Sequence, residues 1–232
     1  MLEIQDLTLK YGQSQILHGI SLTAEPGKVT GVMGTNGVGK TSLLKAIAGR
    51  HPFANGSITL NGQTLGHPTA FAAAKAGIAY VPQGREVFPL MTVEENMQTG
   101  FACLGGAGGH RIPDRIFDLF PILKEFLHRR GGDLSGGQQQ QLAIARALIT
   151  QPKVLLLDEP TEGIQPSIIK QIGRVIEVLR EEGEIAIILV EQYFDFAVGL
   201  ADQVFVINRG QVTFNSPNPK QDRATLLESV SI

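Results

Sequence analysis

The sequence has a single cysteine, Cys103, among 232 residues. One cysteine excludes an internal disulfide and a cysteine-based metal cluster, and it is typical of a reducing compartment. We expect its side chain to be a small buried hydrophobic group. Long hydrophobic runs are also missing, since none approaches the ~20 residues that cross a bilayer. The N-terminus alternates apolar and polar residues, unlike a signal peptide, so the chain is expected to be soluble by itself.

An excess of charge of one sign is missing as well. Twenty Lys and Arg residues stand against 22 Asp and Glu residues, and the formal net charge is −2. No nucleic acid partner is expected, because phosphate backbones select strongly basic surfaces. Hydrophobic residues make up 43% of the chain, which is enough for one large domain, or for one domain with an inserted lobe.

Short apolar runs predict the sheet. Continuous runs of β-branched residues and Leu are typical of parallel strands covered on both faces, and they occupy residues 29–33, 78–81, 154–157, 185–190 and 204–207. Residues 2–10 alternate as a half-buried strand does, and residues 57–65 predict a hairpin around Asn61-Gly62. Amphipathic helices are predicted at 41–48 and 168–179. Strands alternating with helices indicate a doubly wound α/β core.

Residues 92–149 break this alternation and have mostly helical patterns. We therefore predict a single domain over 1–232, with a core at 1–87 and 150–232 and an inserted helical lobe at 88–149. The glycine-rich segment 105–109 is interpreted as a flexible joint within the lobe. The glutamines at 138–141 are interpreted as one polar turn of a packed helix, because apolar residues follow at once.

A phosphate-binding loop is predicted between the first buried strand and the helix after it. The sequence GTNGVGKT at 34–41 matches G-x-x-x-x-G-K-[ST] in the strand–loop–helix context that this motif requires. Its glycines let backbone N–H groups surround phosphates, while Lys40 reaches the β- and γ-phosphate oxygens and Thr41 is a ligand for Mg²⁺. The expected nucleotide-binding residues here are Gly34, Asn36, Gly37, Val38, Gly39, Lys40, Thr41 and Ser42.

Two carboxylates follow the apolar run at 154–157, where α/β sheets place their functional sites. Asp158 is predicted to hold Mg²⁺, and Glu159 to accept the proton of an attacking water as general base. A second anion-binding helix end is predicted in the sequence LSGGQQQQ at 134–141, because the first N–H groups of a helix have no intrahelical partners.

Together, GTNGVGKT, LSGGQQQQ and VLLLDEPT resemble the motifs of the nucleotide-binding subunit of ATP-binding cassette (ABC) transporters, over essentially the whole chain. The resemblance implies a P-loop NTPase core with an N-terminal antiparallel β subdomain and an inserted α-helical subdomain, with ATP and Mg²⁺ as cofactors. It also implies that two cassettes pair head to tail, so that one chain closes the ATP site of the other. The residues acting across that interface would be Ser135, Gly136, Gly137 and Gln138.

Other positions take their roles from the same resemblance. Tyr11 would stack on adenine, although a tyrosine at a strand end could instead belong to the core. Gln83, in YVPQGR, would be a ligand of Mg²⁺ or position water. Gln192 stands where the family usually has a histidine that contacts the γ-phosphate. An amide can donate a hydrogen bond but cannot carry the positive charge of an imidazolium, so we expect slower hydrolysis or two unequal sites in a mixed dimer.

None of the five histidines of the chain matches the family's histidine at the position of Gln192. All five are expected at the surface: His18, His51, His67, His110 and His128. The segment Glu162-Gly163-Ile164-Gln165 takes the place of the family's Ser-Ala-Leu-Asp, which crosses the dimer interface. An apolar patch at Val87, Phe88, Leu90 and Met91 is interpreted as a docking surface for membrane subunits.

The sequences of longer segments indicate a particular branch of this family. Residues 81–89, 161–166 and 190–192 resemble the ATPases of bacterial branched-chain amino acid importers, and residues 112–121 and 129–134 resemble the urea and short-amide branch. The implied function is to energise uptake of urea or short amides, with branched-chain amino acids as the alternative. A soluble ABC ATPase not linked to transport, and a module that binds ATP without hydrolysing it, are remoter alternatives.

The resemblance also implies partners and a location. The partners would be two transmembrane permease subunits, a second ABC ATPase subunit in a heterodimer or a homodimer and, indirectly, a periplasmic solute-binding protein. The chain would lie in the cytoplasm, peripheral to the inner face of the bacterial cell membrane.

Overall fold

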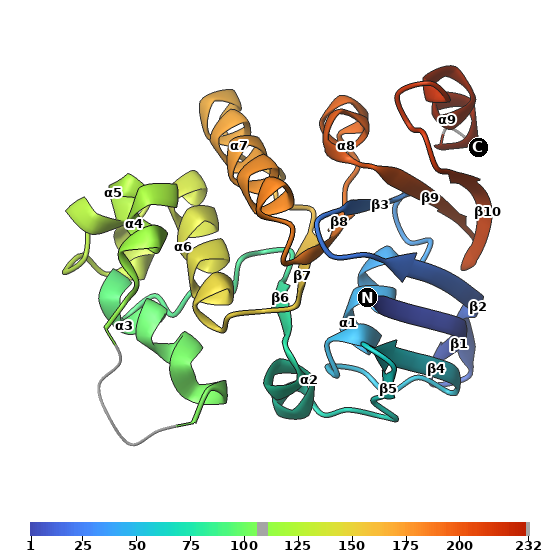
Figure 1. The fold of residues 1–232 in the computed structure, drawn as a ribbon, viewed down its shortest axis with the longest axis horizontal. Helices are drawn as coiled ribbons and strands as arrows, with labels where there is room; N and C mark the ends of the chain where they lie inside the picture. Colours follow the sequence, from blue (N-terminus) through green and yellow to red (C-terminus); the bar gives the residue numbers. More distant parts are fainter. Residues whose placement is uncertain (106–110, 231–232) are drawn as a thin grey trace.

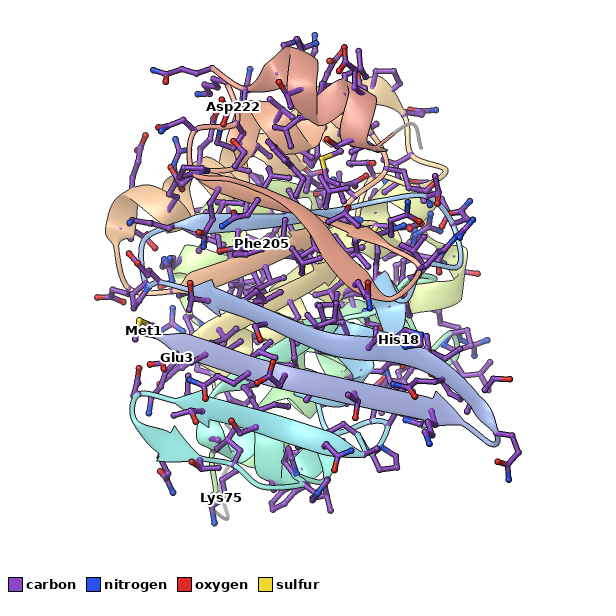
Figure 2. All side chains as sticks on the ribbon, turned by 90° about the vertical axis from the view of Figure 1, so that its right-hand side faces the viewer. Met1, Glu3, His18, Lys75, Phe205 and Asp222 are labelled. Atoms are coloured by element: carbon purple, nitrogen blue, oxygen red, sulfur yellow. The ribbon has the colours of Figure 1, made fainter. Side chains whose placement is uncertain are left out.

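The computed structural model describes residues 1–105 and 111–230. Two sheets lie side by side, with the helices between 93 and 149 placed on the side away from the antiparallel sheet (Figure 1). The smaller sheet is antiparallel in the order β2-β1-β4-β5, and its strands are β1 (Leu2–Tyr11), β2 (Ser14–Ala24), β4 (Asn55–Leu60) and β5 (Gln63–Thr64). Figure 2 views this sheet from its outer side, with Glu3 and His18 on its strands.

The larger sheet has the order β10-β9-β3-β8-β7-β6. Its strands β3, β6, β7, β8 and β9 pair in parallel, and only β10 is antiparallel. Their bounds are β3 (Val29–Met33), β6 (Ile78–Val81), β7 (Val154–Asp158), β8 (Ala186–Val190), β9 (Gln203–Asn208) and β10 (Gln211–Ser216). The prediction of a buried parallel sheet from five apolar runs is therefore confirmed.

The helices are α1 (Lys40–Ile47), α2 (Ala70–Ala76), α3 (Val93–Gln98), α4 (Asp114–Leu119), α5 (Pro121–Glu125), α6 (Gly136–Ile149), α7 (Pro166–Glu182), α8 (Phe194–Leu200) and α9 (Arg223–Val230), with 3-10 turns at Thr99–Cys103 and Gly131–Asp133. Both predicted amphipathic helices are present, as α1 and α7. None of the helices in the described ranges has both the length and the apolar character needed to span a bilayer.

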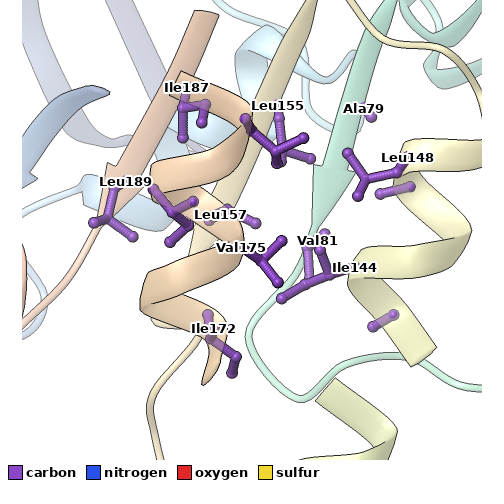
Figure 3. Close-up of a cluster of buried hydrophobic side chains, with 14 of the residues drawn as sticks. Ala79, Val81, Ile144, Leu148, Leu155, Leu157, Ile172, Val175, Ile187 and Leu189 are labelled. Atoms are coloured by element: carbon purple, nitrogen blue, oxygen red, sulfur yellow. The ribbon is translucent and has the colours of Figure 1, made fainter. Parts of the chain in front are cut away.

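Continuous apolar strands are explained by burial on both faces, because neighbouring residues of a strand point to opposite sides. In β7, Leu155 and Leu157 face α6 and α7, where they pack near Val175 and Ile144 (Figure 3). The alternate residue Leu156 joins the other cluster, which fills the space between this sheet, α1 and the antiparallel sheet. The carboxyl ends of the parallel strands are thus fixed by core on both sides.

Two predictions, for Cys103 and for the glycine-rich segment 105–109, are not confirmed by the structure. Cys103 is only partly buried, in the 3-10 turn Thr99–Cys103, so the prediction of a buried residue is not met. This short turn lies at the rim of a cavity and cannot cover its side chain fully. The predicted joint at 105–109 falls, apart from Gly105, outside the described residues.

Candidate functional site

The loop between β3 and α1 depends on glycines. Gly34 has φ 146°, and a Cβ there would lie 2.2 Å from the carbonyl oxygen of Ile207. Gly39 has φ 109°, and its Cβ would lie 2.6 Å from Cδ2 of Leu17. Any side chain at either position would collide with a neighbouring strand in a backbone conformation that L-residues avoid. Gly37, at φ 79°, faces open space instead, so the loop is held by the sheets on one side and is open on the other.

Lys40 is buried at the start of α1 and is held by the loop itself. Its Nζ donates hydrogen bonds to the carbonyl oxygens of Gly34 (2.8 Å) and Thr35 (2.9 Å), and it lies 3.8 Å from Oε1 of Glu159. Burial lowers the pKa of Lys40, and the nearby carboxylates of Glu159 and Asp158 oppose that shift. The ammonium group is therefore positioned inside the loop beside two carboxylates.

Glu159 lies between two glutamines because β6, β7 and β8 are neighbours in the sheet. Gln83 follows β6 and donates from Nε2 to Oε2 of Glu159 (3.2 Å), while Gln192 follows β8 and donates to Oε1 (2.7 Å). Gln83 also donates to Oε2 of Glu162 (2.9 Å). The carboxyl ends of parallel strands meet at one edge, so three distant segments converge on one carboxylate.

Asp158, the last residue of β7, is buried and accepts two hydrogen bonds. The donors are Oγ1 of Thr41 (3.1 Å) and the hydroxyl of Tyr80 (2.9 Å). Desolvation raises the pKa of Asp158, and both hydrogen bonds counteract it. The contact with Tyr80 was not anticipated from the sequence, where this tyrosine only extended an apolar run.

The oxygen donors around Asp158 fit a magnesium ion. In the described residues no group of three or more His, Cys, Asp or Glu side chains is placed to hold a metal. Mg²⁺ needs no such cage, because it is usually held by one or two protein oxygens together with substrate phosphates and water. The hydroxyl of Thr41 already donates a hydrogen bond to the carboxylate of Asp158, and Thr41 and Gln83 line one cavity.

A cavity of about 650 Å³ lies over the loop and these strand ends. Most of the expected nucleotide-binding residues line it, whereas Val38 packs into the core and Gly34 lies beneath the loop against β9. The lining residues with an aromatic, polar or charged side chain include Tyr11, Lys40, Thr41, Gln83, Glu159 and Gln192. The site predicted from separate motifs is therefore one continuous space.

Tyr11 ends β1 at the rim of this cavity. Its side chain is 42% exposed, and its ring centroid lies 4.3 Å from that of His51. The alternative that it is a core tyrosine is wrong, because its ring is exposed and belongs to neither of the two buried clusters. Its exposed ring is available to stack against a planar ligand at the cavity edge.

Replacing Tyr11 with alanine should raise the Kd for Mg-ATP by about 5–150-fold, since stacking of a base on an aromatic ring contributes ~1–3 kcal/mol. Tyr11→Phe keeps the ring and should bind within about twofold of wild type. Titration of each variant with a fluorescent ATP analogue would measure this. Equal affinity of the alanine variant would show that Tyr11 does not contact the base.

The second predicted anion site is the start of α6. Ser135 caps this helix: its Oγ accepts from the N–H of Gln138 (3.4 Å), and Oε1 of Gln138 accepts from the N–H of Ser135 (2.9 Å). Within the described chain, no hydrogen bond of the Gly136 or Gly137 N–H is found. None of these four residues is among those lining the 650 Å³ cavity. In this structure the turn therefore lies outside the cavity of its own chain.

The histidines are at or near the surface. His18, His67 and His128 are exposed and His51 is partly buried against Tyr11, while His110 lies outside the described residues. No histidine lines the cavity in the described part of the chain, and Gln192, the second residue after β8, lines it instead.

Comparisons with known proteins agree with this geometry. A family model described as ABC transporter matches residues 17–162. The chain is 42% identical to the high-affinity branched-chain amino acid transport ATP-binding protein BraG of Pseudomonas aeruginosa, over 93% of this chain and 92% of that protein. It is 36% identical to the probable branched-chain amino acid transport ATP-binding protein LivF of Archaeoglobus fulgidus, over 93% and 91%.

Solved structures share the fold. A nucleotide-free ATP-binding cassette from an ABC transporter superposes with a TM-score of 0.84 at 25% identity, covering 98% of this chain and 95% of that one. A dimeric bacterial ABC transporter cassette superposes with a TM-score of 0.83 at 24% identity, covering 93% and 98%.

Proposed function

We propose, because this chain belongs to the ABC transporter family, that its ATPase activity drives uptake of urea or short amides. The chain is the ATP-binding and ATP-hydrolysing subunit of an ABC importer. The observation that carries the mechanism is the position of Glu159, whose carboxylate lies 3.8 Å from Nζ of Lys40 and contacts both Gln83 and Gln192.

Each residue then has a defined task. Lys40 exchanges the loop carbonyls for β- and γ-phosphate oxygens, and the exposed loop N–H groups surround the phosphates. Glu159 accepts the proton of the water that attacks the γ-phosphorus, while the bond to the ADP oxygen breaks. Thr41, Asp158 and Gln83 would hold Mg²⁺, which when bound neutralises charge on the phosphates. Gln83 and Gln192 orient the carboxylate and the water.

We place the cap of the site on a second cassette. Ser135, Gly136, Gly137 and Gln138 form an anion-receptive helix end that is not part of this chain's cavity. Head-to-tail pairing with a sister ATPase, or with a second copy, would bring this turn to the γ-phosphate held by the opposite P-loop. ATP would then stabilise the dimer, and hydrolysis would release it.

A second cavity of about 480 Å³ is our proposed docking site for a permease subunit. Phe71 (61% exposed) and Phe88 (47%) line it, and Leu90 (80%) lies close to Phe88 in the chain. Large exposed apolar side chains gathered at one groove are typical of a partner surface. Part of the expected patch is different, because Val87 packs against the core. The groove lies between the core and the proposed helical lobe at 88–149, and it would hold the chain on the inner face of the membrane.

The proposal also names the transported substrate. Residues 112–121 and 129–134 resemble the urea and short-amide branch, and this supports urea. The names of the two relatives above favour branched-chain amino acids as the second candidate. No residue of this chain would touch the substrate, which is selected by the binding protein and the permeases.

Uptake into proteoliposomes tests this proposal. Vesicles that contain this chain, its sister ATPase and both permeases are expected to accumulate labelled urea when its binding protein and Mg-ATP are supplied together. The non-hydrolysable analogue AMP-PNP serves as control and should support no accumulation. Accumulation of labelled leucine in place of urea would establish the second candidate, and ATP-independent uptake of either would contradict the importer role.

A further inference from the structure

Glu191 is a buried carboxylate directly after β8, and its side chain is only 2% exposed. Its Oε1 accepts hydrogen bonds from the backbone N–H (3.0 Å) and Oγ1 (2.7 Å) of Thr161. Its Oε2 accepts from the backbone N–H groups of Gln192 (3.0 Å) and Tyr193 (3.2 Å). Four donors therefore converge on one side chain, and two of them belong to a segment 30 residues away.

These contacts join the segments after β7 and β8. Thr161 lies two residues beyond Glu159, and Gln192 is the next residue after Glu191. The N–H of Glu159 is itself bonded to the carbonyl of Val190 (2.9 Å). The turn that carries the proposed base is thus attached to the end of β8 at two points. Glu159 bonds the backbone of Val190, and Thr161 bonds the side chain of Glu191.

The backbone of Glu159 needs such support. Its φ is 48°, in the left-handed region, which costs a residue other than glycine ~1–3 kcal/mol and persists where surrounding contacts impose it. The same turn continues to Glu162, which bonds Gln83. Displacement of Thr161 would therefore move Glu159 and loosen the contact with Gln83 together.

We propose that Glu191 is a positioning residue for ATP hydrolysis, which holds Glu159 and Gln192 in register by binding Thr161 on one side and the backbone of Gln192 on the other. Glu191 does not serve as the base, because its oxygens are already engaged by four donors of the chain. The inference rests on the proposed function, since it presupposes that Glu159 activates water.

Glu191→Gln is the direct test. The amide has the shape of the carboxylate, but one of its two ends now presents N–H groups to donors of the chain, so hydrogen bonds at one of the two oxygen positions are lost. In the assembled transporter kcat should fall by about 10–100-fold, as expected for a small misplacement of reacting groups. The KM for Mg-ATP should stay within about threefold, because the phosphate loop is untouched. Glu184→Gln, at an exposed residue before β8, is the matched control and should have wild-type kinetics.

Two variants of Thr161 keep the test decisive if Glu191→Gln does not fold. Thr161→Ser retains the hydroxyl and should keep kcat within about twofold, whereas Thr161→Val removes it and should lower kcat by about 3–10-fold. The double variant Glu191→Gln/Thr161→Val should be little worse than Glu191→Gln alone, since both changes weaken the same connection between the segments that follow β7 and β8.

Unchanged kcat in both Glu191→Gln and Thr161→Val would overturn the inference, and so would a KM that rises as much as kcat falls. Fully multiplicative effects in the double variant would also contradict it. Wild-type protein without Mg-ATP turnover would instead contradict the proposed function, so the two failures are distinguishable.

Discussion

Glu159→Gln is expected to lower kcat for ATP by about 10²–10⁴-fold in the assembled transporter, the range lost with a general base. The amide cannot take the proton of the attacking water, although it fills the same space between Gln83 and Gln192. Binding of Mg-ATP should persist, because Lys40 and the loop are unchanged. ATP should then accumulate in a long-lived dimer, detectable by size-exclusion chromatography with bound nucleotide.

Glu177→Gln provides the control, because this exposed residue of α7 lies outside the cavity. Its turnover should match the wild type, measured by release of phosphate in a single-turnover experiment. If Glu159→Gln hydrolysed ATP at the wild-type rate, the assignment of Glu159 as general base would be wrong.

A shared site predicts an equally large effect from the far end of the chain. Ser135→Arg should lower turnover by about 10²-fold or more, because it blocks an anion-binding turn that caps the γ-phosphate. Lys40→Ala should do the same from the phosphate side. Ser135 does not line this chain's cavity, so the Ser135→Arg chain should still bind ATP with ordinary affinity.

Mixing the two inactive chains separates pairing in trans from closure within one chain. A dimer of one Lys40→Ala chain and one Ser135→Arg chain has both lesions in one site and none in the other. Random pairing of independent sites should then restore about a quarter of the turnover of a wild-type homodimer preparation at the same concentration. No recovery, combined with turnover per chain that is independent of protein concentration, would rule out the shared site.

The larger sheet shows which strands the hydrophobic pattern alone can predict. The runs at 29–33, 78–81, 154–157, 185–190 and 204–207 match β3, β6, β7, β8 and β9 within a residue or so, because burial on both faces favours apolar side chains at nearly every position of a strand. The strands β2 and β10 were not predicted. Both are edge strands with mixed burial, so their patterns are weaker.

Roles that depend on local chain geometry were also predictable. Gly34 and Gly39 are required by positive φ and close packing, Gly37 has a positive φ alone, and Ser135 caps α6 as its sequence suggests. The role of Tyr11 was open in the sequence, because strand-end tyrosines are found both inside and outside cores. Only its exposure at the cavity rim decided between them.

The sequence by itself determined the phosphate loop, the buried strands and the two carboxylates at the end of β7, since each follows from neighbours a few positions away. The tertiary structure decided which side chains meet there. Thr41 and Asp158 are 117 positions apart, Tyr80 and Asp158 78, and Glu191 and Thr161 30. These contacts follow from the strand order β3-β8-β7-β6. Hydrophobic periodicity records that a strand is buried but not which strand lies beside it, so this order is not encoded locally.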